Sequence, residues 1–136
     1  MLSTFPVLII CSDQTHRDKT AEIVRNIGLQ PFLCPSLSDA RALIGRQTFQ
    51  FVLCGDDLPD CNLRTSLKAL SVSTGGIPVI VLSRLADWDA YMNALRAGAF
   101  DYIACPPDPV ESERILRLAL GCNPRPHPRR AFRKAA

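Results

Sequence analysis

Five short apolar runs recur along the chain, at residues 7–10, 32–34, 51–54, 79–82 and 102–105. Three of them, 7–10, 51–54 and 79–82, are apolar without alternation. Continuous apolar runs are typical of strands covered on both faces, as in a parallel sheet that lies between two layers of helices. The pattern therefore predicts five strands in such a sheet.

Amphipathic stretches follow each of these runs. Their apolar positions recur at helical spacing: Thr20, Ile23, Val24 and Ile27; residues 38–44; Leu63, Leu67 and Leu70; Tyr91, Ala94 and Leu95; and Ile115, Leu118 and Ala119. Glycines 28, 45, 98 and 121 stand after four of the stretches, where a left-handed residue ends a helix. Five strand–helix repeats predict a doubly wound α/β fold, (βα)5, whose ligand site lies at the carboxyl ends of the strands.

Size and composition limit the possible functions. With 136 residues, the chain has room for one domain, which we place at residues 1–121. No apolar run approaches the roughly 20 residues of a membrane-spanning helix, and the amino terminus reads poorly as a secretory signal, so we expect a cytoplasmic protein. The six cysteines are scattered without a C-x-x-C pair, so we expect reduced thiols.

Charge separates the end of the chain from its body. Residues 122–136 hold five of the sixteen basic residues, no acid, and three prolines. Like charges and helix-breaking residues predict a basic, proline-rich and disordered tail.

The predicted ligand edge contains few residues of obvious chemistry. Polar or reactive side chains follow four of the strands: Cys11, Ser12 and Asp13; Gly55, Asp56 and Asp57; Ser83; and Cys105 with Pro106. Motifs for nucleotide binding, for a serine nucleophile elbow and for metalloproteases are all missing, so we expect no enzymatic activity.

The spacing of several anchors resembles a known family. Leu58-Pro59-Asp60 follows the third run, Ser83 ends the fourth, Gly98-Ala99 leads to Tyr102, and Pro106 follows the fifth. This arrangement resembles the receiver domain of two-component response regulators, of the chemotaxis-regulator type with flavodoxin-like topology. The resemblance implies that Ser83 matches the switch hydroxyl, Tyr102 the switch aromatic, and Pro106 a proline that follows a conserved lysine through a cis bond.

The same alignment predicts a degenerate site, or pseudo-receiver. The family holds Mg²⁺ through an acidic pair, phosphorylates an aspartate and neutralises the phosphoryl oxygens with a lysine. Here Cys11 and Ser12 match the acidic pair, Gly55 the phospho-acceptor and Cys105 the lysine. Glycine has no oxygen to phosphorylate, and a thiol is a poor ligand for a hard cation, so we expect neither a Mg²⁺ cofactor nor another metal.

Neighbouring residues offer two ways to restore chemistry. Asp56 follows the acceptor position, but a shift of one residue turns a strand side chain to the opposite face unless a bulge re-aims it. Cys11 and Cys105 are expected at the ends of neighbouring strands, with Cys61 nearby, where thiols can sense oxidants or hold a soft metal. The simpler interpretation is that these cysteines are small buried hydrophobic residues. We expect no histidine to join them as a metal ligand, because His16 is expected on the exposed start of the first helix.

These observations favour a stand-alone atypical receiver that acts through protein–protein contact without aspartyl phosphorylation. The expected partner is another signalling protein, a kinase or an effector, or a second copy of the chain. One alternative is a regulator phosphorylated on Asp56 in altered geometry. Another is association of the tail with nucleic acid or an anionic surface, which five charges without an aromatic ladder would make non-specific. We expect no membrane partner.

Aromatic residues suggest where a partner binds. Trp88 and Tyr91 are three apart on the fourth predicted helix, and Tyr102 starts the adjacent fifth strand. Aromatic side chains are frequent interface anchors. We therefore predict an interaction face built from the fourth helix, fifth strand and fifth helix; alternatively, Tyr91 and Tyr102 pack inward and only Trp88 is exposed.

Overall fold

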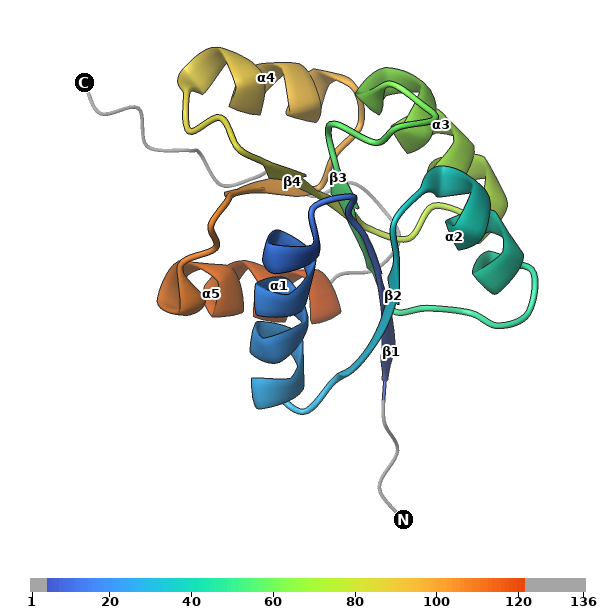
Figure 1. Cartoon of the computed structure of the whole chain (residues 1–136), viewed down its shortest axis with the longest axis horizontal. Coiled ribbons are helices and arrows are strands. Elements are labelled where there is room, and N and C mark those ends of the chain that lie inside the picture. The colour runs from blue at the N-terminus through green and yellow to red at the C-terminus, as the bar shows by residue number, and fades with distance from the viewer. Residues whose placement is uncertain (1–4, 122–136) are drawn as a thin grey trace.

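The computed structural model describes residues 5–121. The predicted tail at 122–136 lies outside the described residues. Strands and helices alternate in the expected order (Figure 1). The strands are β1 (Pro6–Ile10), β2 (Gln30–Cys34), β3 (Val52–Gly55), β4 (Val79–Ser83) and β5 (Asp101–Ala104); the helices are α1 (Gln14–Asn26), α2 (Leu37–Ile44), α3 (Leu63–Thr74), α4 (Trp88–Arg96) and α5 (Pro109–Leu120).

All five strands form one parallel sheet in the order β2-β1-β3-β4-β5. The chain winds outward in one direction from β1 to β2 and in the other from β3 to β5. This is the predicted doubly wound fold, and its switch point lies between β1 and β3. The carboxyl ends of these two central strands therefore open the crevice in which such folds bind ligands.

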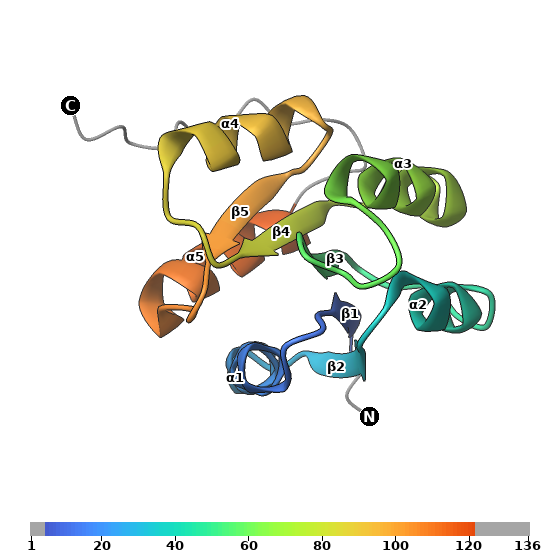
Figure 2. The same cartoon turned by 45° about the horizontal axis from the view of Figure 1, so that its top comes forward.

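Helices cover both faces of the sheet, α1 and α5 on one side and α2, α3 and α4 on the other (Figure 2). Alternate residues of each strand supply the two cores. In β1, Val7 and Ile9 face α1 and α5, whereas Leu8 and Ile10 face the opposite layer, and all four side chains are fully buried. Burial on both faces explains why the central strands are apolar without alternation.

Carboxylates cap three of the five helices at the ligand edge. Asp13, Asp87 and Asp108 each accept a hydrogen bond from the backbone N–H three residues on, beginning α1, α4 and α5. Asp60, from the β3–α3 loop, accepts from Leu37 N at 3.1 Å and Ser38 N at 3.0 Å at the start of α2. The positive ends of these helices are thus already matched by the protein's own carboxylates.

The ends of the helices correct part of the sequence analysis. Gly28 has a φ of 85°, the left-handed conformation expected after a helix, but Gly45 (φ −69°) and Gly121 (φ −83°) are right-handed. These two glycines continue the helical conformation for one residue and are not left-handed stops. Leu118, assigned to the apolar stripe of the last helix, is 46% exposed, and Leu116 is buried in its place.

Candidate functional site

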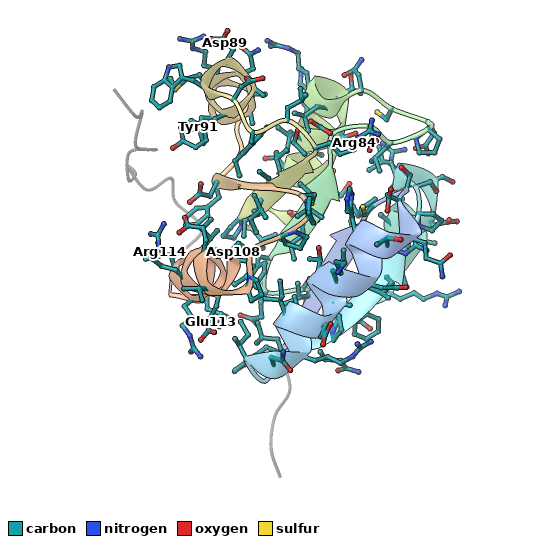
Figure 3. The ribbon with its side chains drawn as sticks, turned by 60° about the vertical axis from the view of Figure 1, so that its left-hand side comes forward. Arg84, Asp89, Tyr91, Asp108, Glu113 and Arg114 are labelled. Atoms are coloured by element: carbon teal, nitrogen blue, oxygen red, sulfur yellow. The ribbon has the colours of Figure 1, made fainter. Side chains whose placement is uncertain are left out.

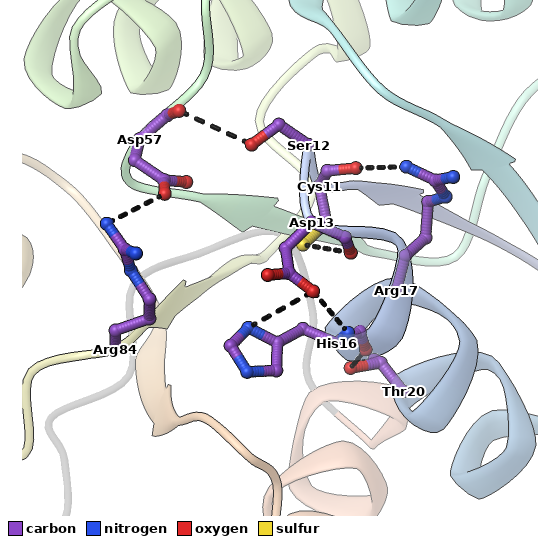
Figure 4. Close-up of polar contacts among 8 residues, drawn as sticks. All are labelled: Cys11, Ser12, Asp13, His16, Arg17, Thr20, Asp57 and Arg84. Atoms are coloured by element: carbon purple, nitrogen blue, oxygen red, sulfur yellow. Dashed lines mark hydrogen bonds and ion pairs between the residues drawn. The ribbon is translucent and has the colours of Figure 1, made fainter.

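A shallow hollow lies at the carboxyl edge, next to the switch point. Residues from four loops line it: Cys11, Asp13, His16, Gly55, Asp56, Asp57, Leu82, Ser83, Arg84 and Cys105. The structure thus brings together most of the residues that the sequence placed at this edge. Ser12 is exposed at the rim, where its hydroxyl donates to the carbonyl oxygen of Asp57 at 3.5 Å (Figure 4).

Gly55 is buried at the end of β3, and its backbone does not require glycine. A Cβ built at this position would lie 3.4 Å from the carbonyl oxygen of Ile10 and 3.6 Å from the Cα of Cys11. It would also lie 3.7 Å from Oδ1 of Asp57. Position 55, which matches the family's phospho-acceptor, therefore has room for a side chain but carries only a hydrogen atom. The carboxylate of Asp57 borders this space.

Asp57 is a residue that the sequence placed at this edge without giving it a role. Its Oδ2 lies 3.3 Å from an Nη atom of Arg84, on the loop after β4 (Figure 4). Alternation was the available signal, because residues two apart in an extended segment point to the same side, so Asp57 rather than Asp56 shares the direction of residue 55. The ion pair links the loops that follow β3 and β4.

Asp13 is engaged in local structure. Its Oδ1 accepts from the backbone N–H of His16 at 2.9 Å, and this hydrogen bond lowers the pKa of the Asp13 carboxyl below its usual value. His16 Nδ1 is 3.8 Å from the same oxygen, and its side chain is only 17% exposed. The expectation of an exposed His16 is therefore wrong: it begins α1 as expected, but it borders the hollow.

Asp56 remains at the edge, because it lines the hollow and its backbone N–H donates to Leu82 O at 3.0 Å. Its charge contributes, after burial, to the raised pKa values of Cys105 and Tyr102, both on the β5 side. Asp57, by contrast, is the carboxylate that borders the space beside Gly55.

Cys11 and Cys105 are not on neighbouring strands, as the sequence analysis expected, because β3 and β4 lie between β1 and β5. Both line the hollow, and both are free thiols. Burial, followed by neighbouring negative charge, raises the pKa of Cys11 and takes that of Cys105 to about 12. Such thiols stay protonated at neutral pH, so they are poor nucleophiles and poor metal ligands.

The residues present do not fit the magnesium ion that the family resemblance implies. Of the three residues after β1, Cys11 offers a protonated thiol, Ser12 a hydroxyl turned to Asp57, and Asp13 a carboxylate that caps α1. Within residues 5–121, no group of three or more His, Cys, Asp or Glu side chains is arranged to hold a metal ion.

The residues that match the family's switch positions contact one segment. Ser83 Oγ accepts from the backbone N–H of Leu85 at 3.0 Å, and the Tyr102 hydroxyl donates to the carbonyl oxygen of the same residue. The Cys105–Pro106 peptide bond is cis, as the resemblance predicted. Ser83 and Tyr102 therefore both bond to the backbone of Leu85, on the loop after β4.

The three aromatic residues of the predicted interaction face are not equally accessible. Tyr91 is 2% exposed and Tyr102 is 5% exposed, so of the two alternatives the inward packing of these rings is confirmed and their place on the surface is wrong. Tyr91 extends from α4 toward β5 (Figure 3), and Trp88, partly buried, lies beside it with ring centroids 5.6 Å apart. Of the three, only Trp88 offers surface to a partner; whether this face binds one stays a prediction.

In the described part of the chain, no helix is both long and apolar enough to cross a membrane.

A family model described as the response regulator receiver domain matches residues 7–117. The transcriptional regulatory protein ZraR of Salmonella typhimurium is 26% identical over 114 residues, 84% of this chain and 26% of that protein. The chain therefore spans about a quarter of the length of the curated relatives that it matches first.

Solved structures show the same fold. A CheY-like receiver domain protein from Methanospirillum hungatei matches with a TM-score of 0.76 and 24% identity, covering 87% of this chain and 94% of that one. The receiver domain of the sensor histidine kinase PA1611 from Pseudomonas aeruginosa matches with 0.77 and 22%, covering 88% and 100%. The latter structure is described with a magnesium ion coordinated in its active-site cleft.

Proposed function

The chain belongs to the response regulator receiver family of two-component signalling, and from that premise we propose that it is a pseudo-receiver, which contacts other signalling proteins without accepting a phosphoryl group. The observation that carries this proposal is Gly55. It stands at the acceptor position, and a glycine offers no oxygen to attack phosphorus.

The surroundings of Gly55 support the proposal independently. Phosphoryl transfer depends on cations that neutralise the charge developing on the transferred group. Cys105 replaces the family's lysine, and its protonated thiol carries no charge. Arg84 is the cation nearest to Asp57 in the described hollow, and it is paired with that carboxylate. An incoming phosphoryl group, which is negatively charged, would therefore meet the carboxylates of the hollow with little positive charge to offset the repulsion.

Output in this proposal runs through contact with another chain. The expected partner is a kinase, an effector or a second copy, and the surface formed by α4, β5 and α5 is the proposed interface, with Trp88 as its accessible aromatic anchor. We propose a cytoplasmic location and no catalytic turnover. Because the chain matches only about a quarter of its curated relatives' length, the activities of those whole proteins are not carried over.

Intact-mass spectrometry after incubation with acetyl phosphate and Mg²⁺ tests the proposal. We expect wild-type protein to keep its original mass. A species heavier by one phosphoryl group, lost on Asp56→Asn, would contradict the proposal and establish the alternative in which Asp56 is the acceptor. Loss on Asp57→Asn instead would identify the carboxylate beside Gly55 as the acceptor.

A further inference from the structure

The loop between β4 and α4, residues 84–87, borders the proposed interaction face. Leu85 is 55% exposed on this loop, and Trp88 begins α4 directly after it. The position of the loop therefore decides how an apolar side chain and the aromatic anchor are presented. Two sets of contacts, on opposite sides of the loop, hold it to the rest of the domain.

The first set comes from the loop after β3. Arg84 lies 3.3 Å from Asp57 Oδ2, while Oδ1 of the same carboxylate borders the empty position beside Gly55 (Figure 4). The ion pair therefore places a fixed negative charge next to the position where the family's acceptor stands, and that charge holds the first residue of the loop.

The loop that carries Asp57 is itself fixed at two further points. Ser12 donates to the Asp57 carbonyl oxygen at 3.5 Å, and Asp60 accepts two hydrogen bonds from the start of α2. Asp57 is thus presented to Arg84 from a segment tied both to β1 and to α2.

The second set comes from Tyr102 on β5 and from Ser83, the last residue of β4. The buried Tyr102 donates its hydroxyl hydrogen bond to the carbonyl oxygen of Leu85, and Ser83 Oγ accepts from the Leu85 N–H at 3.0 Å. The Tyr102 ring packs edge to face on Tyr91, which fixes the direction of its hydroxyl. Both backbone groups of Leu85 are therefore satisfied within the domain.

We propose that Asp57, through Arg84, and Tyr102, through Leu85, hold the β4–α4 loop in one position, so that this chain presents its α4–β5–α5 face without a phosphoryl signal. The holding contacts stand on the geometry alone; the meaning of that face as a partner surface rests on the proposed function. The tyrosine hydrogen bond is partly buried, whereas the side chains of Arg84 and Asp57 are 67% and 40% exposed, so the ion pair is the weaker restraint and is screened by salt.

Amide hydrogen exchange of Leu85, measured by NMR, tests this arrangement. We expect Asp57→Asn and Arg84→Gln each to accelerate the exchange of Leu85 by about twofold at low salt. The double variant should exchange no faster than either single variant, because both substitutions remove the same ion pair. Tyr102→Phe should accelerate exchange more, by roughly fivefold, because a partly buried hydrogen bond to the loop backbone is lost. The matched control is Arg117→Gln, which removes an exposed ion pair with Glu113 (2.8 Å) on α5 and should leave Leu85 unchanged.

Unchanged thermal unfolding temperatures of the charge variants will show that they are folded. If Leu85 then exchanges at the wild-type rate in both charge variants, the proposal is overturned, even if Tyr102→Phe alone accelerates exchange. Equal acceleration in Arg117→Gln would also overturn it, because the effect would not be specific to the loop. Phosphorylation is read by mass and loop order by exchange, so this proposal and the proposed function can fail separately.

Discussion

Tyr91 and Tyr102 meet edge to face beneath α4, with ring centroids 5.9 Å apart and planes at 90°. This contact joins α4 to β5 within the core, and it leaves Trp88 as the partly exposed aromatic residue of the predicted face. The two aromatic residues of α4 should therefore respond differently to truncation.

We predict that Tyr91→Ala lowers the free energy of unfolding by about 3 kcal/mol, because it empties a buried, well-packed ring position. Trp88→Ala should cost much less stability, yet weaken self-association or partner capture. Urea unfolding measures the first effect, and sedimentation with pull-down from the same preparations measures the second. A folded Trp88→Ala protein with unchanged association would remove Trp88 from the proposed interface.

A second prediction concerns Gly55. Its backbone is not in the left-handed region, and an added Cβ meets its neighbours at 3.4 Å or more. Gly55→Ala should therefore change the free energy of unfolding by no more than about 1 kcal/mol. Alanine lowers the conformational entropy of the unfolded chain, which stabilises the folded state, and this offsets the slight crowding of the new Cβ against its neighbours. A loss well above this value would show that the fold requires glycine there, and the absence of an acceptor would then have a structural cause.

Asp60 predicts a dependence of stability on pH. Hydrogen bonds from Ser38 N and Leu37 N lower the pKa of its carboxyl below the ordinary value of 3.8. A carboxyl whose folded pKa is depressed contributes stability above its unfolded pKa and loses it as the pH falls through the folded value. The difference in unfolding temperature between wild type and Asp60→Asn should therefore be largest at neutral pH and shrink below about pH 4.

Asp18→Asn, which removes an exposed carboxylate from the side of α1, is the matched control for this series. It should show no comparable convergence with wild type at low pH. A constant difference between wild type and Asp60→Asn from pH 7 to pH 3 would contradict the proposed capping of α2, as measured by thermal unfolding in buffers of equal ionic strength.

The sequence was sufficient for the fold because the signal is local and repeated. Each strand is an apolar run bounded by polar residues, and the run ends match the observed strands to within a residue or two. Strand order is not encoded in this way, since hydrophobic alternation along the chain does not state which strands are neighbours. For that reason Cys11 and Cys105 were placed on adjacent strands when two strands separate them.

The site was predicted in position but not in its contacts. The contacts of a loop residue depend on how its flexible side chain turns, so spacing could put Asp57 on the side of residue 55 but could not give its ion pair with Arg84. Burial of Tyr91 likewise could not be predicted from helical spacing. Trp88 and Tyr91 lie on the same side of α4, and the rotation of the helix about its own axis decides which of the two rings packs against β5. The residue types at Gly55 and Cys105, by contrast, are read directly from the sequence, and they are the basis of the proposed loss of phosphorylation.

We propose that this edge cannot accept a phosphoryl group because particular side chains are missing, while the fold that would carry them is intact. The most direct measurement compares wild type with a rebuilt variant, Cys11→Asp, Ser12→Asp, Gly55→Asp and Cys105→Lys combined, by intact mass after treatment with acetyl phosphate and Mg²⁺. We predict that the rebuilt protein gains the mass of one phosphoryl group, and that the gain is lost when residue 55 is returned to glycine. Wild type should gain none; a phosphorylated wild-type protein would contradict the account.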